Sequence, residues 1–183
     1  MPVDRKTECL EDLRRRILTL DMPPGSALEE TALCARYGMS RTPMREILQK
    51  LNGEGYVELS QNRGAKVASM DLGVMRVFFR TAPMIYAAIS RLAAENRQSQ
   101  DLALLRDVQD DFRDATNQSD TAKSAMLNHR FHLQIGYMAR NPYLLPSLER
   151  MLIDHTRLSQ TFYNPGSEDE RGRIARAVDQ HDA

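Results

Sequence analysis

The chain has 183 residues, of which 42% are hydrophobic and 27% are charged, a composition that excludes a mainly disordered protein. This length allows one domain of ordinary size or two small ones. Lys and Arg together number 25, as do Asp and Glu, so the chain is not a polycation that binds nucleic acid through total charge. Any nucleic-acid partner must therefore be recognised by particular arginines.

The sequence indicates a cytoplasmic protein without disulfides. We find no stretch that approaches the roughly 20 apolar residues of a membrane-spanning helix, and the first residues lack the apolar core of a signal peptide. Cys9 and Cys34 lie in helix-like segments without CxxC spacing or a Cys/His cluster, which is typical of free thiols that are buried or half-buried.

The first 38 residues predict two helices. Apolar residues recur at helical spacing from Leu10 to Leu20, and the segment Met22-Pro23-Pro24-Gly25 cannot continue that helix. A second helix is expected from about Glu29 to Tyr37, and Gly38 ends it where a left-handed residue is common.

Ser40 and Pro43 predict the start of a third helix, because serine is a favoured N-cap and proline is tolerated in the first turn. The inward stripe of this helix consists of Met44, Ile47, Leu48 and Leu51, and the outward face carries Arg41, Thr42, Arg45 and Gln49. Two helices joined by a tight glycine-containing turn, the second presenting basic and polar residues, are typical of a helix-turn-helix.

From Tyr56 the apolar period changes from 3.6 to 2. Two short alternating runs flank a polar turn over residues 61–64, which predicts a β-hairpin that ends near Met70. Three helices followed by a small hairpin predict a winged helix-turn-helix domain over residues 1–70.

Residues 71–183 predict an all-helical second domain, so the fold class is mostly α, with a helical bundle after the winged domain. Helices are expected over about 72–96, 101–118, 120–139 and 144–163, with a further one from near Ser167. Pro83 predicts a kink in the first of them. Because the chain ends within a periodic stretch, we expect this second domain to be truncated at its C-terminus.

Asn128 and His132 are the candidate metal ligands that the residues themselves suggest. They are spaced i, i+4 and so lie on one helix face, where both can reach one ion. The alternative is that His132 is a hydrogen-bonded core histidine beside Phe131. His129 and His155 have no partner at useful spacing and are expected to be surface or packing residues.

Four motifs of the first domain are distinctive: Leu28-x-Glu30-x-x-Leu33, Ser40-Arg41-Thr42-Pro43-x-Arg45-Glu46, Leu51-x-x-Glu54-Gly55-Tyr56-Val57 and Asn62-Arg63-Gly64-Ala65-x-Val67. Together they resemble the DNA-binding domain of the GntR family of bacterial transcription regulators. The resemblance implies that the third helix enters the major groove of double-stranded DNA and that the wing contacts the backbone or minor groove. The implied DNA-binding residues are Thr31, Ser40, Arg41, Thr42, Arg45, Asn62, Arg63, Gly64 and Lys66.

In the second domain, Asn128-His129-Arg130-Phe131-His132, the later Asn141-x-x-Leu144 and Gln180-His181 resemble the FCD effector domain of the FadR-type branch of that family. The resemblance implies a divalent metal, Zn²⁺ or Ni²⁺, held by Asn128, His132 and His181, with the family's last histidine beyond Ala183. It also implies an effector carboxylate at Arg80, although Met84 stands where that pattern usually has Glu.

The sequence therefore predicts a homodimeric transcription regulator that binds a pseudo-palindromic operator and responds to a small organic acid or similar metabolite. The alternative is a metal-dependent enzyme that uses the helical domain, with the first domain as a regulatory part. It has little support, since the chain contains no nucleophile beside a base, no phosphate-binding loop and no HExxH.

Overall fold

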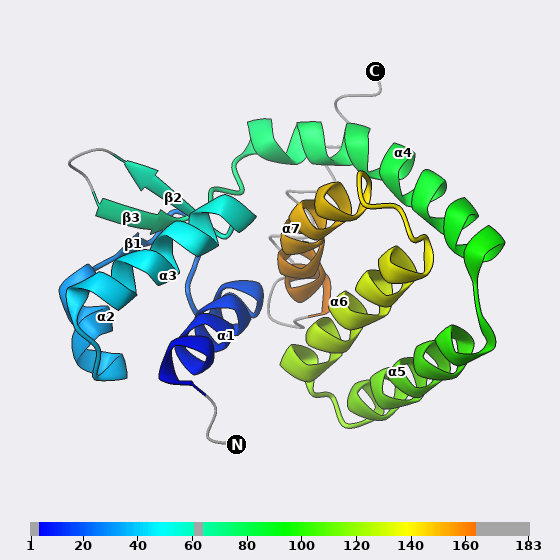
Figure 1. Ribbon diagram of the computed structural model, residues 1–183, viewed down its shortest axis with the longest axis horizontal. Coiled ribbons are helices and arrows are strands. Elements are labelled where there is room, and N and C mark those ends of the chain that lie inside the picture. Colours follow the sequence, from blue (N-terminus) through cyan, green and yellow to red (C-terminus); the bar gives the residue numbers. More distant parts are fainter. Residues whose placement is uncertain (1–3, 61–63, 164–183) are drawn as a thin grey trace.

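The computed structural model describes residues 4–60 and 64–163, which fold into two parts (Figure 1). The first part contains three helices and a small sheet, and the second part contains four helices. Asn62, Arg63, His181 and the helix predicted from near Ser167 lie outside the described residues.

The first part is a winged helix-turn-helix. Its helices are α1 (Arg5–Leu18), α2 (Glu30–Tyr37) and α3 (Arg41–Glu54), and its strands are β1 (Ala27–Leu28), β2 (Val57–Ser60) and β3 (Gly64–Val67). All pairings are antiparallel in the order β1-β3-β2, with Leu28 opposite Ala65 and Val57 opposite Val67. The hairpin is confirmed, whereas β1 was not predicted, because two residues are too few to show an alternating pattern.

The turn between α2 and α3 sets the direction of α3. Gly38 has φ +60° and closes α2 in the left-handed conformation, as predicted. Ser40 precedes α3 in an extended conformation and is its N-cap residue, as predicted, although its hydroxyl makes no cap hydrogen bond. Pro43 lies in the first turn of α3, where its missing N–H costs nothing.

The apolar faces of α1 and α3 form the core of the first part. Leu13, Ile17, Met44 and Leu51 are completely or almost completely buried there. Ile153, which belongs to the second part of the chain, is also a member of this cluster. The core of the DNA-binding fold is thus completed by a residue about 100 positions further along the sequence.

Both cysteines are free thiols, as expected. Cys9 is buried in the core, and this burial raises the pKa of its thiol to about 11. The protonated, unreactive form therefore prevails at neutral pH.

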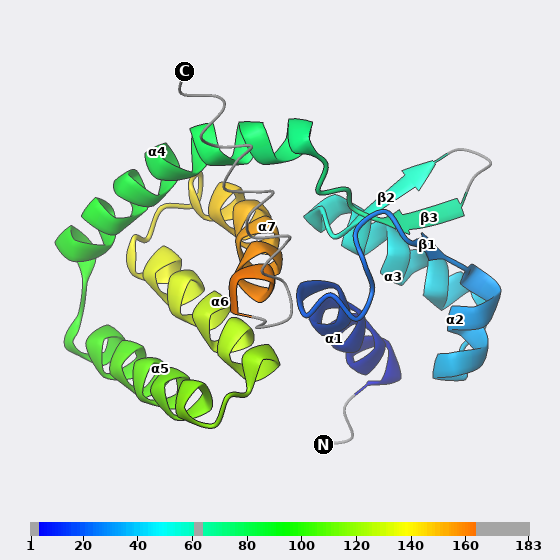
Figure 2. The same ribbon diagram turned by 180° about the vertical axis from the view of Figure 1, so that it is seen from behind.

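The second part consists of α4 (Leu72–Asn96), α5 (Ser99–Asn117), α6 (Thr121–Met138) and α7 (Leu145–Tyr163). Helix α5 packs on α6, α6 packs on α7, and α4 curves over both α6 and α7 (Figures 1 and 2). Gly136 permits the close approach of α6 and α7, because a Cβ atom there would lie 2.5 Å from a methyl group of Leu148. The four predicted helices are confirmed within a few residues at their ends.

Helix α4 is the one helix among the described residues that is long and apolar enough to cross a membrane, which corrects the expectation that no such stretch exists. Only 11% of its most apolar segment is buried in this chain. Large apolar side chains are exposed along it at Leu72, Val77, Phe79 and Met84. The fold that surrounds α4 is that of a winged helix-turn-helix with a helical bundle.

Helix α7 joins the two parts. Arg157 is completely buried, its Nη1 donates to the carbonyl oxygen of Ala68 at 2.7 Å, and its Nη2 donates to the carboxylate of Asp154. Ala68 directly follows β3, so α7 is tied to the start of the segment that leads into α4. The two parts therefore meet through the buried hydrogen bond from Arg157 to Ala68 as well as through Ile153.

We predict that Ile153→Ala destabilises the protein by about 2–5 kcal/mol, because it leaves a cavity in the core of the winged domain. The neighbouring Leu152→Ala is the matched control, since Leu152 is equally buried but belongs to the core of the helical part. Urea unfolding measures both losses, and limited proteolysis of residues 68–71 should accelerate more in Ile153→Ala. Equal cleavage in both variants would contradict the shared core.

Candidate functional site

The exposed face of α3 presents two arginines at the start of the helix. Arg41 and Arg45 have side chains that are 68% and 63% exposed, while Met44 and Ile47 on the opposite face are buried. Thr42 and Gln49 are exposed on the same side as the arginines. The helix therefore offers donors that can reach the base edges of a major groove.

Glu30, in the first turn of α2, holds both arginines. Its Oε2 accepts from Arg45 Nε at 2.8 Å, and its Oε1 lies 3.8 Å from Arg41 Nε. The hydrogen bond to Glu30 raises the pKa of Arg45. One carboxylate cannot neutralise two guanidinium groups, so this face keeps a net positive charge that suits DNA phosphates.

A hollow of about 490 Å³ lies between this face and the wing. It is lined by Thr31 and Arg45 from the helices and by Gly64 from the sheet, among others. The structure thus brings these three predicted residues together, while Ser40 and Thr42 lie exposed at the start of α3. Lys66 differs from them, because its Nζ pairs with Glu58 across the hairpin at 2.9 Å.

A second group of polar side chains meets inside the helical part, where α4, α6 and α7 converge. His132 and His155 have ring centroids 4.7 Å apart, and Nε2 of His155 lies 3.5 Å from Nδ2 of Asn128. Tyr86 of α4 places its Oη 2.5 Å from Nδ1 of His155. We name Tyr86, Asn128, His132 and His155 the histidine cluster.

The expectation that His155 has no partner at useful spacing is wrong. Helices α6 and α7 are antiparallel and joined by a short loop, so residues at equal distances from that loop lie opposite one another. Asn128 precedes Asn141 by 13 residues, and His155 follows Pro142 by 13 residues. Asn128 and His155 are thus equally far from the Asn-Pro turn, and this symmetry is the sequence pattern that predicts their contact.

Both imidazoles of the cluster are neutral around pH 7. Burial lowers the pKa of His132 to about 4, with a smaller contribution from the other histidines, and burial also lowers the pKa of His155. Each ring therefore carries one nitrogen with a free lone pair unless a donor occupies it. Neutral imidazole is the form that binds a metal ion.

His129 faces away from this cluster. Its Nδ1 lies 2.8 Å from Oγ1 of Thr156, and that hydroxyl donates its own hydrogen to the carbonyl oxygen of Leu152 at 2.7 Å. The hydroxyl must therefore accept from His129, which fixes the Nδ1–H tautomer and makes His129 a packing residue, as expected. Burial lowers its pKa to about 4.

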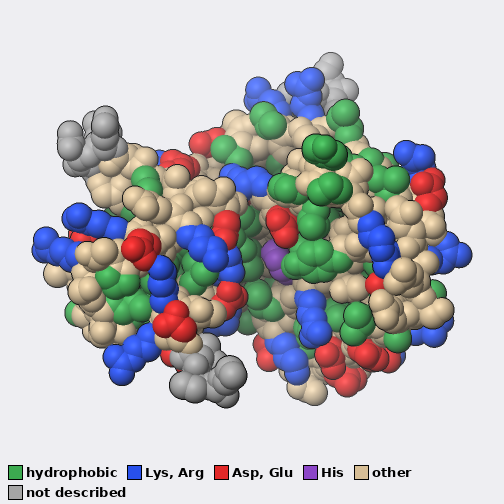
Figure 3. All heavy atoms as spheres, viewed as in Figure 1, with side chains coloured by type: hydrophobic (Ala, Val, Ile, Leu, Met, Phe, Trp, Pro, Cys, Tyr) green, Lys and Arg blue, Asp and Glu red, His purple; other side chains and the backbone are tan. Residues whose placement is uncertain are grey.

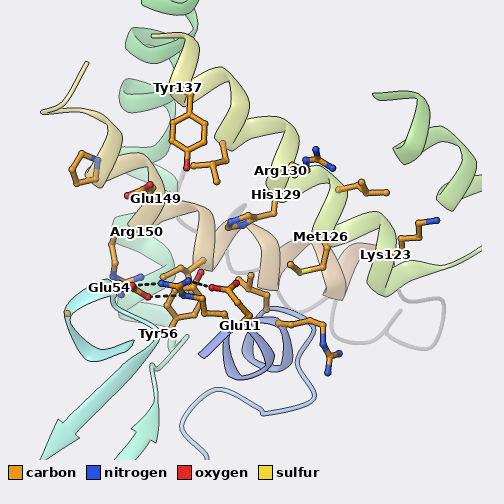
Figure 4. Close-up of a pocket in the computed structure, with 18 residues that line it drawn as sticks. Glu11, Glu54, Tyr56, Lys123, Met126, His129, Arg130, Tyr137, Glu149 and Arg150 are labelled. Atoms are coloured by element: carbon orange, nitrogen blue, oxygen red, sulfur yellow. Dashed lines mark hydrogen bonds and ion pairs between the residues drawn. The ribbon is translucent and has the colours of Figure 1, made fainter. Parts of the chain in front are cut away.

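A cleft of about 930 Å³ lies between the two parts rather than at the histidine cluster. Figure 3 shows the hollow, and Figure 4 shows residues from α1, α3, α6 and α7 around it, with His129 between the two parts. Its charges are mainly paired within the protein, since Arg14 bonds both Glu54 and Glu11, and Arg150 bonds Asp154. The cluster, whose imidazoles are neutral and half-buried, is the stronger candidate for a ligand site.

Arg80 does not join the cluster. Its side chain is exposed, whereas Met75, Ala82 and Ile89 mark the buried face of α4. At 100° per residue, Arg80 points roughly 160° away from Ala82. Nothing in this arrangement supports the predicted effector contact at Arg80.

The described residues contain no group of three His, Cys, Asp or Glu side chains that could hold an ion. A metal in the cluster would therefore need the amide oxygen of Asn128 as a ligand. Asn128 and His132 do lie on one face of α6, as the sequence predicts, and amide oxygen with imidazole nitrogen forms a donor set that fits Zn²⁺ or Ni²⁺.

Comparison with known proteins gives the same division of the chain. The model of the gntR family of bacterial regulatory proteins matches residues 6–67, and the FCD domain model matches residues 83–183. The Nta operon transcriptional regulator of Aminobacter aminovorans is 26% identical over 125 residues, which are 68% of this chain and 59% of that protein. The chain thus spans well under two thirds of this relative.

The Glc operon transcriptional activator of Escherichia coli K12 is 28% identical over 160 residues, covering 77% of this chain and 63% of that protein. Among solved structures, E. coli McbR/YncC has a TM-score of 0.71 at 23% identity and covers 88% of this chain and 74% of its own. A putative GntR regulator from Rhodococcus sp. RHA1 has a TM-score of 0.65 at 20% identity, covering 98% and 85%. These two likenesses establish the fold.

The two family models together match most of the chain, in the order of the two parts of the structure. The chain belongs to the GntR family of bacterial regulatory proteins, in the branch that carries an FCD domain.

Proposed function

We propose that this chain is a transcription regulator that binds an operator as a homodimer and responds to a small organic acid or similar metabolite. The observation that carries the proposal is the pair of exposed arginines, Arg41 and Arg45, at the start of α3 in a winged helix-turn-helix. The two relatives described above are named as regulators of transcription, which favours this function over the alternative of a metal-dependent enzyme.

In the proposed complex, the N-terminal end of α3 enters the major groove. Arg41 and Arg45 donate to guanine O6 and N7 or to phosphate, and Ser40, Thr42 and Thr31 donate to phosphate. The wing reaches the backbone or minor groove with Asn62, Arg63, Gly64 and Lys66, and Gly64 lets the main chain come close. Glu30 releases the arginines as DNA oxygens replace its carboxylate.

We place the effector site in the helical part, at the histidine cluster. Its polar side chains come from three helices, α4, α6 and α7, and Tyr86 packs against the apolar core of the helical part. Polar side chains in an apolar surrounding are typical of small-molecule sites. Asn128 and His132 would hold the metal ion, together with His181, and the ion would supply a Lewis acid that attracts an anionic effector. We take the functional boundary between the two domains near residue 70.

A second copy of the chain is the proposed cover for the apolar surface of α4. Leu72, Val77 and Met84 are 64–70% exposed, which is unusual for large apolar side chains of a monomer. Pairing two chains through this helix would present two α3 helices to the two halves of a pseudo-palindromic operator.

Helix α7 is the proposed link between effector and DNA. His155 points into the histidine cluster, while Ile153 and Arg157 contact the winged domain. A ligand that shifts α7 at His155 therefore acts on the junction at Ala68, which changes the populations of the relative positions of the two parts.

We expect Arg45→Ala to weaken binding to the DNA upstream of the protein's own gene by roughly 5- to 150-fold, the effect of losing a good base-edge contact. Arg113→Ala is the matched control, because Arg113 is 66% exposed and also pairs with a carboxylate, but lies on α5. Gel shifts at fixed salt measure both. Equal affinities of the two variants would contradict the assignment of α3 as the recognition helix.

The dimer can be tested with Val77→Glu. A charge in the centre of an apolar interface is left without water or a partner, so we expect the full chain to sediment as a dimer and this variant as a monomer. Leu104→Glu is the control, because Leu104 is an exposed apolar residue of α5, outside the proposed interface. A wild-type chain that sediments as a monomer at micromolar concentration would refute the α4 interface.

A further inference from the structure

The histidine cluster contains three donor groups that the fold brings from two helices to one point. We propose that His155 is a ligand of a divalent transition metal that it shares with Asn128 and His132, and that Tyr86 orients its ring. The inference deepens the proposed function, because it rests on the metal site suggested there by Asn128 and His132. It adds a ligand from α7, the helix that contacts the winged domain.

The distance between His155 and Asn128 fits two ligands better than it fits a hydrogen bond. Their nitrogens are 3.5 Å apart, beyond the 2.7–3.2 Å range that is usual for N–H donors. Two ligands bound at about 2.1 Å to a tetrahedral ion stand roughly 3.4 Å apart. A half-turn of the Asn128 amide exchanges its nitrogen and oxygen, so that Oδ1 occupies this position.

The two histidine rings are also correctly spaced for one ion. Their centroids are 4.7 Å apart and the ring planes are tilted by 46°. Two imidazoles that each bind a common ion through one nitrogen have centroids roughly 5 Å apart. Direct stacking does not explain this arrangement, because the planes are far from parallel.

Tyr86 supplies the outer partner that a ligating histidine requires. Its Oη lies 2.5 Å from Nδ1 of His155, so the ring can donate Nδ1–H to the phenol oxygen and keep the lone pair on Nε2. A ligating imidazole almost always donates its second N–H to an oxygen in this way. The same Nε2 is the atom that lies next to Asn128.

The donor set determines which metal fits. Two imidazoles and one amide oxygen favour Zn²⁺, Ni²⁺ or Co²⁺ over Mg²⁺ and Ca²⁺, which prefer oxygen ligands. All three protein donors are neutral, so the bound ion keeps its full double charge. A fourth position on such an ion attracts an anion, and a carboxylate is a suitable one.

The test is a titration of the chelator-treated full chain with Co²⁺, whose absorption in the visible range reports ligand number and geometry. His155→Gln should weaken binding at least tenfold, as His132→Gln should, and Tyr86→Phe should weaken it less. His129→Gln is the matched control, because His129 is a half-buried histidine next to Asn128 that is bonded to Thr156 instead. Its Co²⁺ spectrum and affinity should equal those of the wild type.

His181→Gln separates the two possible sources of the third ligand. We expect this variant still to bind Zn²⁺ through two imidazoles, those of His132 and His155. X-ray absorption at the zinc edge counts these imidazoles while His155 itself stays unchanged. The proposal is overturned if His155→Gln binds Co²⁺ as the wild type does, if the zinc of His181→Gln has fewer than two imidazoles, or if the wild type binds no metal.

Gel shifts of the same proteins measure operator binding separately from metal binding. The metal ligand and the proposed regulatory function can therefore fail independently of each other. Operator binding by the metal-free chain depends on α3 and not on the cluster. Loss of metal with intact operator binding in His155→Gln supports the ligand, and normal metal binding by a chain that binds no operator would refute only the regulatory function.

Discussion

The arrangement of the whole molecule depends on the burial of Arg157. A guanidinium group taken out of water costs several kcal/mol unless its charge and hydrogens find partners. Here Asp154 provides the charge from the same helix, and the carbonyl of Ala68 provides an acceptor from the other part of the chain. Burial lowers the pKa of Arg157, but a guanidinium group stays charged in proteins. The charge is therefore permanent, and α7 is held at one place on the junction.

This position gives α7 two different environments on its two sides. Ile153 fills the core of the winged domain, and His155, two residues later, lies among side chains of α4 and α6. Because a packed core resists gradual deformation, a change on one side of such a helix is passed to the other as a shift of the whole helix. Couplings of this type usually amount to about 1–3 kcal/mol, which is sufficient to change DNA occupancy many-fold.

The sequence predicts local structure well and non-local contacts poorly. The spacing of apolar residues gives the helices of both parts, and Gly38 fixes the turn before α3, because these features depend on neighbours within one or two turns. The strand β1 depends on pairing with β3, and Ile153 depends on a core formed by residues far earlier in the sequence, between Cys9 and Val67. Neither contact changes the spacing of apolar residues along the sequence, so that spacing does not predict it.

The candidate site follows the same rule. Asn128 and His132 are neighbours on one helix, so their i, i+4 spacing predicts that they lie together, whereas the position of His155 depends on two antiparallel helices around the turn at Asn141. Arg80 is the reverse case, because its role was suggested by a resemblance and its side chain lies on the exposed side of α4. A resemblance can suggest a role for a position, but the direction of its side chain depends on the phase of α4 against the bundle.

The contact of Glu30 with Arg41 and Arg45 has a consequence for how binding responds to ionic strength. When an arginine without another partner binds a DNA phosphate, it releases cations that are condensed on the DNA. Each such contact makes the affinity depend more steeply on salt concentration. An arginine already bonded to a carboxylate exchanges one anionic partner for another. The two arginines of α3 therefore contribute less to the salt dependence than their number implies, and the specificity that they provide persists at salt concentrations where purely electrostatic binding has vanished.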